Sequence, residues 1–247
     1  MKDNGKSKFG FDEIPSKEKQ EKVSAVFSSV SQKYDIMNDI MSFGLHRLWK
    51  DRFCQKAKLR DDDDVLDVAC GTGDIALNIA RMKSNIKITC LDENNDMLTI
   101  CKNRLIDKGF IKNITFLKTQ VEHLNSENQF SLATIAFGFR NFTNPQEALR
   151  NLYKSLKPSG RLLIMDFKTP SDESIKKIYE KYTDYIIPKI GKLVSNDSAS
   201  YQYLSDSIKT YLKPNELEDL MKKNNFIKVD HESLPGDIVT IHVGYKA

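Results

Sequence analysis

Long hydrophobic runs and paired cysteines are both missing from this chain of 247 residues. No apolar stretch approaches the ~20 residues that a membrane-spanning helix needs, and the polar N-terminus MKDNGKSKFG has no signal-peptide core. The cysteines include no Cys-x-x-Cys pair, which favours buried free thiols in a reducing compartment. They are Cys54, Cys70, Cys90 and Cys101. We therefore expect a cytoplasmic protein that is at most peripheral to the inner membrane.

Metal-ligand spacings and dense basic tracts are also missing. The four histidines are widely separated and have no cluster of acids around them, so the sequence predicts no metal site. The net charge of +4 is spread over ordinary helix faces, which argues against nucleic-acid binding. This mild excess is compatible with a weak attraction to anionic lipid headgroups. The sequence carries no signal for oligomeric state, and a homodimer stays open.

Strands and helices alternate from Val65 onward. The expected strands cover 65–70, 87–92, 114–119, 131–137 and 161–167, and the expected helices cover 74–82, 95–108 and 145–156. This alternation predicts an α/β fold with a doubly wound, Rossmann-like parallel sheet that is covered on both faces. Two final strands, 226–234 and 238–245, predict a closing antiparallel hairpin. The sheet would then contain seven strands.

The chain outside the sheet is expected to be mainly helical. Residues 1 to about 15 are expected to be a flexible tail, followed by a helix from Ser16 and a second helix over about 33–58. Four aspartates at 61–64 mark a boundary. The sequence therefore predicts a tail and helical cap over 1–60 and a main domain over 61–247. The main domain would contain a turn at 157–160, a helical insert over about 169–214 and a helix over 214–224.

The stretch VLDVACGTGD, residues 65–74, predicts a strand, a glycine turn and a helix N-terminus. This arrangement lets the backbone approach a nucleotide-like ligand closely. Gly71, Gly73 and Ala76 also satisfy the dinucleotide fingerprint, so NAD is a competing ligand, as is a turn that binds nothing. Asp92, at the end of the next strand, could hold the ribose of either cofactor. Asp67 adds negative charge beside the loop, which favours a cationic ligand such as S-adenosylmethionine.

Several longer sequence motifs extend this pattern over nearly the whole chain. They are FSSVSQKYDIMNDIMSFGLHRLWK (27–50), VLDVACGTGD, FGFRNFTNPQEAL (137–149), LKPSGRLLIMDF (156–167), SYQYLSDSI (200–208) and IHVGYK (241–246). In these motifs the chain resembles the ubiquinone/menaquinone biosynthesis C-methyltransferases, a family of class I S-adenosylmethionine-dependent methyltransferases. The motifs at 27–50 and 137–149 are specific to that family. The resemblance implies S-adenosylmethionine as cofactor and a polyprenylated quinol as substrate.

The resemblance also implies roles for individual residues. Those expected to contact the methionine half of the cofactor are Asp67, Gly71, Thr72 and Gly73. Those expected at the adenosine half are Asp92, Met97, Gln120 and Val121, and Ala136 is also expected to bind the cofactor. Gln120 and Val121 replace the usual Asn-Ala, and Ala136 stands where several relatives have serine. Further departures from the family pattern are Ser159, Asp166, Lys168 and the turn at 235–237.

Three residues are expected to be catalytic by resemblance. Arg140 and Asn141 directly follow an expected strand, where ligands of open α/β sheets bind, and Tyr34 lies in the N-terminal signature. Arg140 would oppose the negative charge of a developing phenolate; alternatively it pairs with a surface acid. His46 is either a base or a structural histidine. The tyrosines of the helical insert either line a substrate pocket or pack in the core.

These observations together predict C-methylation of a polyprenylated hydroquinone, with demethylmenaquinol to menaquinol as the preferred reaction. The ubiquinone-pathway methylation of a polyprenyl methoxy-benzoquinol is the near alternative. An NAD-dependent oxidoreductase and a non-enzymatic scaffold are the alternatives from other classes.

Overall fold

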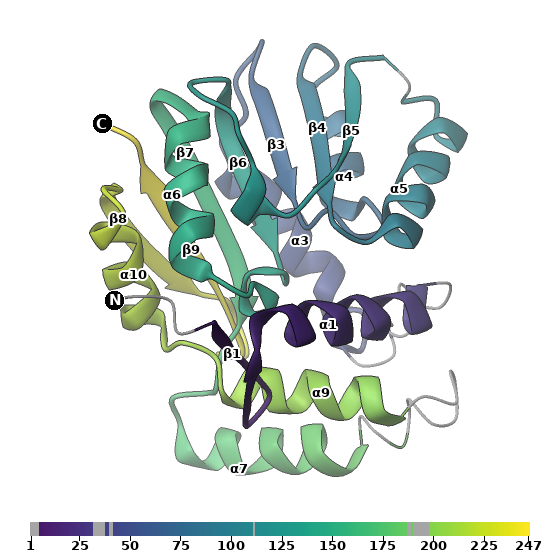
Figure 1. Cartoon of the computed structure of the whole chain (residues 1–247), viewed down its shortest axis with the longest axis vertical. Helices are drawn as coiled ribbons and strands as arrows, with labels where there is room; N and C mark the ends of the chain where they lie inside the picture. Colours follow the sequence, from purple (N-terminus) through teal and green to yellow (C-terminus); the bar gives the residue numbers. More distant parts are fainter. Residues whose placement is uncertain (1–4, 32–37, 40–41, 111, 187–188, 190–197) are drawn as a thin grey trace.

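Seven strands form one sheet in the order β5-β4-β3-β6-β7-β9-β8 (Figure 1). The computed structural model describes residues 5–31, 38–39, 42–110, 112–186, 189 and 198–247. Strands β5, β4, β3, β6 and β7 are parallel, whereas β9 is antiparallel to both β7 and β8. The strands are β3 Asp64–Val68, β4 Lys87–Asp92, β5 Ile114–Lys118, β6 Phe130–Ala136, β7 Leu156–Phe167, β8 Ile227–Ser233 and β9 Val239–Tyr245. The predicted doubly wound sheet with its closing hairpin is confirmed.

Helices cover both faces of the sheet because consecutive strand residues point to opposite sides. In β3, Val65 belongs to one hydrophobic core and Leu66 and Val68 belong to the other. The first core contains α3 Leu45–Lys56, α4 Asp74–Met82 and α5 Asn95–Asp107. The second contains α6 Pro145–Ser155 and α10 Pro214–Lys223. The strand order reverses at β3 and β6, which makes their carboxyl ends the expected ligand site.

Local sequence signals set the helix starts. Asn94 caps α5 by accepting hydrogen bonds from the amides of Asp96 and Met97 at 3.0 and 3.1 Å. Asn144 caps α6 by accepting from the Glu147 amide at 3.0 Å, and Pro145 occupies the first turn. Both caps satisfy amides that have no partner within the helix. These starts agree with the sequence predictions.

Further helices lie beneath the carboxyl ends of the parallel strands (Figure 1). Helix α1 Ser16–Val30 lies next to the strand ends, α9 Ser198–Lys209 lies below it, and α7 Glu173–Lys181 forms the outer layer. A π-helical segment, Tyr182–Ile186, continues α7. The α7 and α9 helices confirm that the insert is helical. The space between this layer and the sheet holds the candidate site.

The tail prediction is wrong for residues 6–15. Strands β1 Lys6–Phe9 and β2 Asp12–Pro15 form an antiparallel hairpin. The hairpin is docked rather than free, because Ser7 Oγ donates to the Thr143 carbonyl at 2.8 Å. The Phe9 ring also stacks on Tyr203 of α9, with centroids 4.2 Å apart. These partners are distant in sequence, so local composition could not reveal them.

The second predicted helix, 33–58, is not one continuous helix. Helix α3 begins at Leu45, because Phe43 and Gly44 before it have left-handed φ values of 50° and 76°. Residues 32–37 and 40–41 lie outside the described part of the chain. Phe53 of α3 is fully buried in the core of the sheet, so the predicted cap shares that core beyond residue 45. The division at residue 60 stays a prediction.

The predicted turn at 157–160 falls inside β7, which begins at Leu156. Ser159 has a φ of 61°, and the pairing of β7 with β6 shifts register between Phe130 and Leu132. The strand therefore starts earlier than expected and is irregular near its start.

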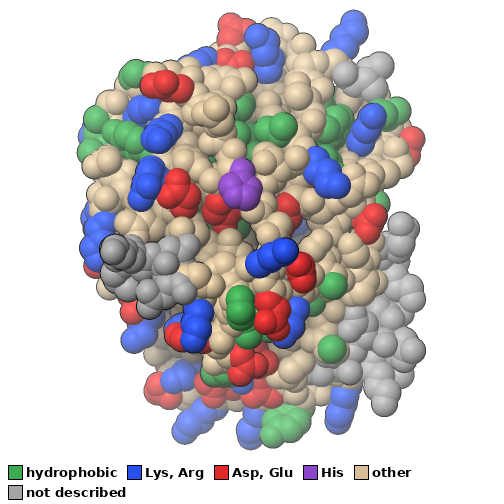
Figure 2. Space-filling view, in the orientation of Figure 1, with side chains coloured by type: hydrophobic (Ala, Val, Ile, Leu, Met, Phe, Trp, Pro, Cys, Tyr) green, Lys and Arg blue, Asp and Glu red, His purple; other side chains and the backbone are tan. Residues whose placement is uncertain are grey.

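The described helices include none that is long and apolar enough to cross a membrane. On the face shown in Figure 2, basic and acidic side chains are interspersed. This distribution agrees with the expectation from the spread of charge along the sequence.

Candidate active site

The loops after β3 and β6 approach each other closely at the point where the strand order reverses. A Cβ atom on Gly138 would lie 2.7 Å from Cβ of Ala69, so this contact requires a glycine. Ala69 and Phe137 both have positive φ, at 51° and 59°, which is uncommon for residues with side chains. Such conformations occur where the surrounding structure enforces them, often at functional sites.

The first of two cavities, called here the loop cavity, lies at the end of β3. Its walls include many of the residues predicted to contact a cofactor: Gly71, Asp92, Met97, Gln120, Val121 and Ala136. Gly71 has a φ of 54° and open space around its Cβ position, so it offers bare backbone to a ligand. Asn141, predicted to be catalytic, also lines this cavity.

Asp92 is held rigidly at the centre of the loop cavity. Its two carboxylate oxygens accept hydrogen bonds from the amides of Gly71 at 2.8 Å and Asn94 at 2.9 Å. Burial raises the pKa of Asp92 to about 6, and these two amides oppose the shift. Each oxygen keeps a second lone pair, so the carboxylate can still accept hydrogen bonds from two ligand hydroxyls.

Helix α1 covers the loop cavity with Val23, Ser24 and Phe27. The Asn94 side chain fixes this cover by donating to the Ser24 carbonyl at 3.0 Å and to Ser28 Oγ at 2.9 Å. The cavity has a volume of about 80 Å³, below the roughly 300–1,000 Å³ of typical ligand pockets. As it stands, the cavity is therefore too small for a nucleoside-sized ligand.

Glu93 and Asn94, which follow Asp92 in the chain, are polar wall residues of the loop cavity that the sequence analysis did not predict. Glu93 accepts a hydrogen bond from Gln120 Nε2 at 2.6 Å, and burial raises the pKa of Glu93. This pairing gives Gln120 a fixed position at the edge of the cavity. The available signal was the run Asp92-Glu93-Asn94 at the end of a strand, but the sequence analysis predicted a ligand contact for Asp92 alone.

Three predicted cofactor residues lie outside the walls of the loop cavity. Thr72 is buried, and Gly73 packs on Cys101, whose Sγ would lie 2.6 Å from a Cβ at that position. Asp67 is buried behind the loop, where Thr134 Oγ1 donates to its Oδ1 at 2.9 Å. Its Oδ2 accepts no hydrogen bond from the described residues.

The burial of Asp67 changes the expectation that this residue places a negative charge beside the glycine loop. Burial raises the pKa of the Asp67 carboxyl to about 8, although the Thr134 hydroxyl and the Ala76 amide oppose the shift. Without a ligand, the group is therefore mostly protonated near neutral pH. The negative charge that faces the loop cavity belongs instead to Asp92 and Glu93.

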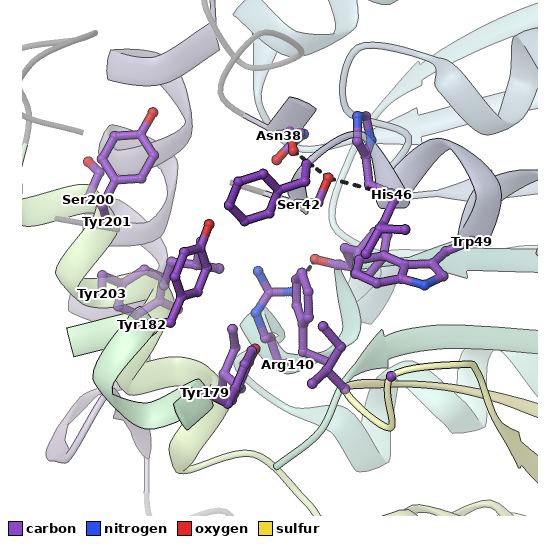
Figure 3. A pocket seen from close by; sticks show the side chains of 18 of the residues that line it. Asn38, Ser42, His46, Trp49, Arg140, Tyr179, Tyr182, Ser200, Tyr201 and Tyr203 are labelled. Atoms are coloured by element: carbon purple, nitrogen blue, oxygen red, sulfur yellow. Dashed lines mark hydrogen bonds between the residues drawn. The ribbon is translucent and has the colours of Figure 1, made fainter. Parts of the chain in front are cut away.

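The second cavity, called here the aromatic cavity, has a volume of about 430 Å³ and lies between the sheet and the helices beneath it. Its aromatic walls come from the N-terminal helices, the loops after β6 and β7, and the insert: Phe27, Phe43, Trp49, Phe137, Phe167, Tyr179, Tyr182, Tyr201 and Tyr203. Four tyrosines of the insert thus line the cavity, as one of the two alternatives for them predicted, whereas Tyr185 is exposed. Figure 3 shows Arg140 between Trp49 on one side and Tyr179 and Tyr182 on the other.

Arg140 is a buried charged group at the wall of the aromatic cavity. Its side chain is only 6% exposed and pairs with Asp166, which is 1% exposed, at 2.8 Å. Its Nε also donates to Ser207 Oγ at 3.3 Å, and its guanidinium lies 5.4 Å from the centre of the Phe167 ring. The partner of Arg140 is therefore a buried acid, not the surface acid of the alternative prediction. Asp166 partly offsets the positive charge that Arg140 presents.

Asn141 follows Arg140 in a short 3-10 turn, Phe139–Asn141, which the buried Phe139 ring anchors. Its Oδ1 accepts a hydrogen bond from the Tyr203 hydroxyl at 3.0 Å. Its Nδ2 is buried and has no hydrogen-bond partner among the described residues. A buried amide donor normally has a partner, so this nitrogen is suited to hydrogen-bond a ligand.

His46 lines the aromatic cavity, and its ring points away from Arg140 (Figure 3). Its Nε2 lies 2.8 Å from Asp39 Oδ1, and burial lowers the pKa of His46 despite this contact. This geometry favours the structural interpretation of His46. Tyr34, the third predicted catalytic residue, lies outside the described residues.

The two cavities adjoin, since Phe27 and Phe137 line both. Arg140 faces one cavity and its neighbour Asn141 faces the other. The site therefore places a carboxylate-bearing chamber for one ligand, which must widen to admit a nucleoside, beside an apolar, aromatic chamber for a second. Such an arrangement suits the transfer of a group from the first ligand to the second.

Known proteins agree with this geometry. The model of the ubiE/COQ5 methyltransferase family matches residues 15–246. The chain is 41% identical over 247 residues to the ubiquinone/menaquinone biosynthesis C-methyltransferase UbiE of Francisella philomiragia, with 99% of each chain covered. It is also 41% identical to the UbiE of Psychromonas ingrahamii, with 96% of each covered.

Solved structures share the fold at much lower identity. A SAM-dependent methyltransferase from Thermotoga maritima matches with a TM-score of 0.62 and 18% identity, covering 90% of this chain and 99% of that one. The chain therefore belongs to the ubiE/COQ5 methyltransferase family and is a C-methyltransferase that uses S-adenosylmethionine.

Proposed function

We propose that the protein methylates an unsubstituted ring carbon of a polyprenylated hydroquinone, converting demethylmenaquinol to menaquinol. The observation that carries this proposal is the aromatic cavity of about 430 Å³ beside the loop cavity. A largely apolar chamber with one buried arginine suits a ligand that is mostly hydrocarbon and has a polar ring at one end. The names of the UbiE relatives point to the same substrate class.

The inner end of the aromatic cavity suits a fused two-ring head group. Phe137 and Phe167 have ring centroids 4.7 Å apart, and Trp49 lies 6.4 Å from each. Aromatic faces at such distances stack favourably on another aromatic ring. Arg140 lies against this group of rings, so a head group held there would place a ring hydroxyl near its guanidinium. Aromatic walls of this kind suit an aromatic head group, and the naphthoquinol is the one we propose.

The residues of the loop cavity fit S-adenosylmethionine. The Asp92 carboxylate would hold the ribose, Met97 and Gln120 would lie at the adenine, and Gly71 would leave room for the backbone to approach the ligand. The buried, unpartnered Nδ2 of Asn141 supplies a donor next to the boundary with the aromatic cavity. When bound, the cofactor supplies a methyl group that is activated by a positively charged sulfur.

Arg140 makes the substrate carbon nucleophilic. A ring carbon becomes nucleophilic when an adjacent hydroxyl loses its proton, because the phenolate then donates electron density into the ring. The Arg140 guanidinium stabilises that phenolate and lowers the pKa of the hydroxyl, and the proton passes to water. Arginine itself stays protonated. Asp166 fixes the orientation of the guanidinium through the 2.8 Å ion pair.

The rim of the aromatic cavity suits entry of the prenyl tail from a membrane surface. Phe43 is 80% exposed and Ile178 is 71% exposed, and both line the cavity. Helix α7 has an apolar stripe, yet none of its residues is buried. Exposed apolar groups around a cavity mark a surface that contacts protein or lipid. We therefore include a transient contact between this rim and the lipid surface in the proposed function.

Direct assay of both quinol classes tests the proposal. Purified protein is mixed with S-adenosylmethionine and either reduced demethylmenaquinone or the reduced methoxy-benzoquinone precursor, each with a short prenyl tail. Mass spectrometry is then expected to detect one added methyl group on the naphthoquinol at the higher kcat/KM. A higher kcat/KM on the benzoquinol would assign the protein to the ubiquinone pathway. Failure to methylate either compound would overturn the proposed substrate class.

A further inference from the structure

Three cysteines from different elements meet behind the glycine loop. Cys70 follows β3, Cys90 lies in β4 and Cys101 lies in α5, and their three Sγ atoms all lie within 4.8 Å of one another. Cys90 and Cys101 are fully buried, and Cys70 is 9% exposed. The sequence predicted no metal site, because its histidines lack ligand spacing and its cysteines include no Cys-x-x-Cys pair. Their meeting depends on the register of the sheet and on how α5 packs against it.

The spacing of the three sulfur atoms matches a trigonal metal site. Thiolate sulfur lies about 2.3 Å from a bound ion such as zinc, which places three sulfurs around one ion roughly 4 Å apart. The observed separations, all within 4.8 Å, approach this value without a change in the backbone. No carboxylate or imidazole of the described residues joins the group. Structural zinc sites use four ligands, whereas soft thiolate ligands suit monovalent copper.

We propose that Cys70, Cys90 and Cys101 form a binding site for one soft, thiophilic metal ion, with Cu(I) as the ion that fits best. The site lies outside both cavities and is distinct from the methyl-transfer machinery. It is nevertheless linked to the glycine loop, since Gly73 packs directly on Cys101 and the Gly73 amide donates to the Cys70 carbonyl at 2.9 Å.

The chemistry of the ligands sets how binding depends on pH. Cysteine binds a metal ion as a thiolate, so coordination by Cys70, Cys90 and Cys101 releases their thiol protons. The affinity for the ion should then rise with pH.

Copper titration tests the site without any methyl acceptor, so its outcome is independent of the proposed function. Reduced protein is titrated anaerobically with Cu(I) in competition with a chromophoric chelator of known affinity. We expect one tightly bound ion per chain, an affinity that increases with pH, and at least a 100-fold loss of affinity in Cys101→Ala. The matched control is Cys54→Ala, because Cys54 is also a buried free thiol but lies outside the cluster. The Cys54→Ala variant should bind Cu(I) as tightly as the wild type does.

Two results would overturn the site. The first is a wild-type protein that loses all copper to the chelator, and the second is a Cys101→Ala variant that binds as tightly as wild type. If Cys101→Ala fails to fold, X-ray absorption of the copper-loaded wild type decides instead. Three sulfur neighbours at about 2.3 Å support the site, whereas fewer sulfurs, or nitrogen and oxygen neighbours, contradict it.

Discussion

The Tyr203 hydroxyl donates a hydrogen bond to Oδ1 of Asn141 at 3.0 Å, and this bond joins the helical insert to the loop after β6. It fixes the orientation of the Asn141 amide, so that Nδ2 remains as the donor without a partner among the described residues. Tyr203 also stacks on Phe9 of the N-terminal hairpin. One tyrosine therefore connects three parts of the chain at the candidate site.

Tyr203→Phe removes only the hydroxyl of this connection. We expect unfolding free energy to fall by about 1 kcal/mol, the usual value for one buried hydrogen bond. We also expect kcat to fall several-fold because the Asn141 amide can rotate. Urea denaturation and steady-state kinetics measure the two effects. Tyr185→Phe is the matched control, since Tyr185 is 66% exposed in the same insert; an equal loss in both variants would contradict the role of the bond.

Arg140→Lys keeps a positive charge but removes the planar guanidinium. Lysine cannot reproduce the paired geometry with Asp166 and Ser207. We expect kcat to fall about 100-fold, the lower end of the range for losing one donor to a developing oxyanion. The affinity for S-adenosylhomocysteine, measured by calorimetry, should change less than threefold. Arg150→Lys, at an exposed position of α6, should behave as wild type. Near-normal turnover in Arg140→Lys would remove Arg140 from the reaction.

Asp92→Asn tests the ribose contact. The substitution removes a charged acceptor of the Gly71 and Asn94 amides, and charged hydrogen bonds contribute roughly 1.5–3 kcal/mol. We therefore expect S-adenosylhomocysteine to bind about 10- to 100-fold more weakly in calorimetric titration. Asp107→Asn, at the end of α5, is the control and should bind normally. Unchanged affinity in Asp92→Asn would reject the assigned contact.

Asp67→Asn should change how stability depends on pH. Because burial raises the pKa of Asp67 from 3.8 to about 8, the folded state holds a proton that the unfolded state releases. The stabilisation that this proton provides is complete below pH 4 and is lost as pH rises towards 8. Between pH 5 and pH 8 the wild type should lose up to about 4 kcal/mol of unfolding free energy from this group.

Urea denaturation at pH 5, 6.5 and 8 measures this loss. The Asp67→Asn variant should lack it, so the stability difference between the two proteins should shift in favour of the variant as pH rises. Titrating groups that do not interact with Asp67 are present in both proteins and cancel in the comparison. Parallel curves for wild type and variant would show that Asp67 is ionised in the folded protein.

The exposed rim of the aromatic cavity makes a prediction about lipid contact. Ile178→Gln and Phe43→Gln should each reduce the fraction of protein that sediments with phosphatidylglycerol-containing vesicles by at least threefold. Ile106→Gln is the matched control, because Ile106 is 46% exposed on α5 and lies outside the rim. If all three variants bind vesicles equally, the rim is not the contact surface.

The sequence predicted best where local periodicity and capping decide the structure. The bounds of α4 and β4 matched because apolar spacing and the glycine loop define them locally. Arg140 and Asn141 were expected to face the site because they directly follow a strand, and each lines a cavity there, while their catalytic roles stay predictions. The Asp166 partner of Arg140, the Tyr203 partner of Asn141 and the cysteine cluster were missed. Each depends on contacts between residues at least 11 positions apart, which no local pattern encodes.

The docking of the β1–β2 hairpin has a consequence for biosynthesis. Residues 6–15 are synthesised long before their partners Thr143 and Tyr203. Domains generally fold from the N-terminus during synthesis, yet this hairpin has nothing to dock on until most of the chain has been translated. A chain truncated before Thr143 would therefore carry an undocked hairpin even where its sheet had begun to form.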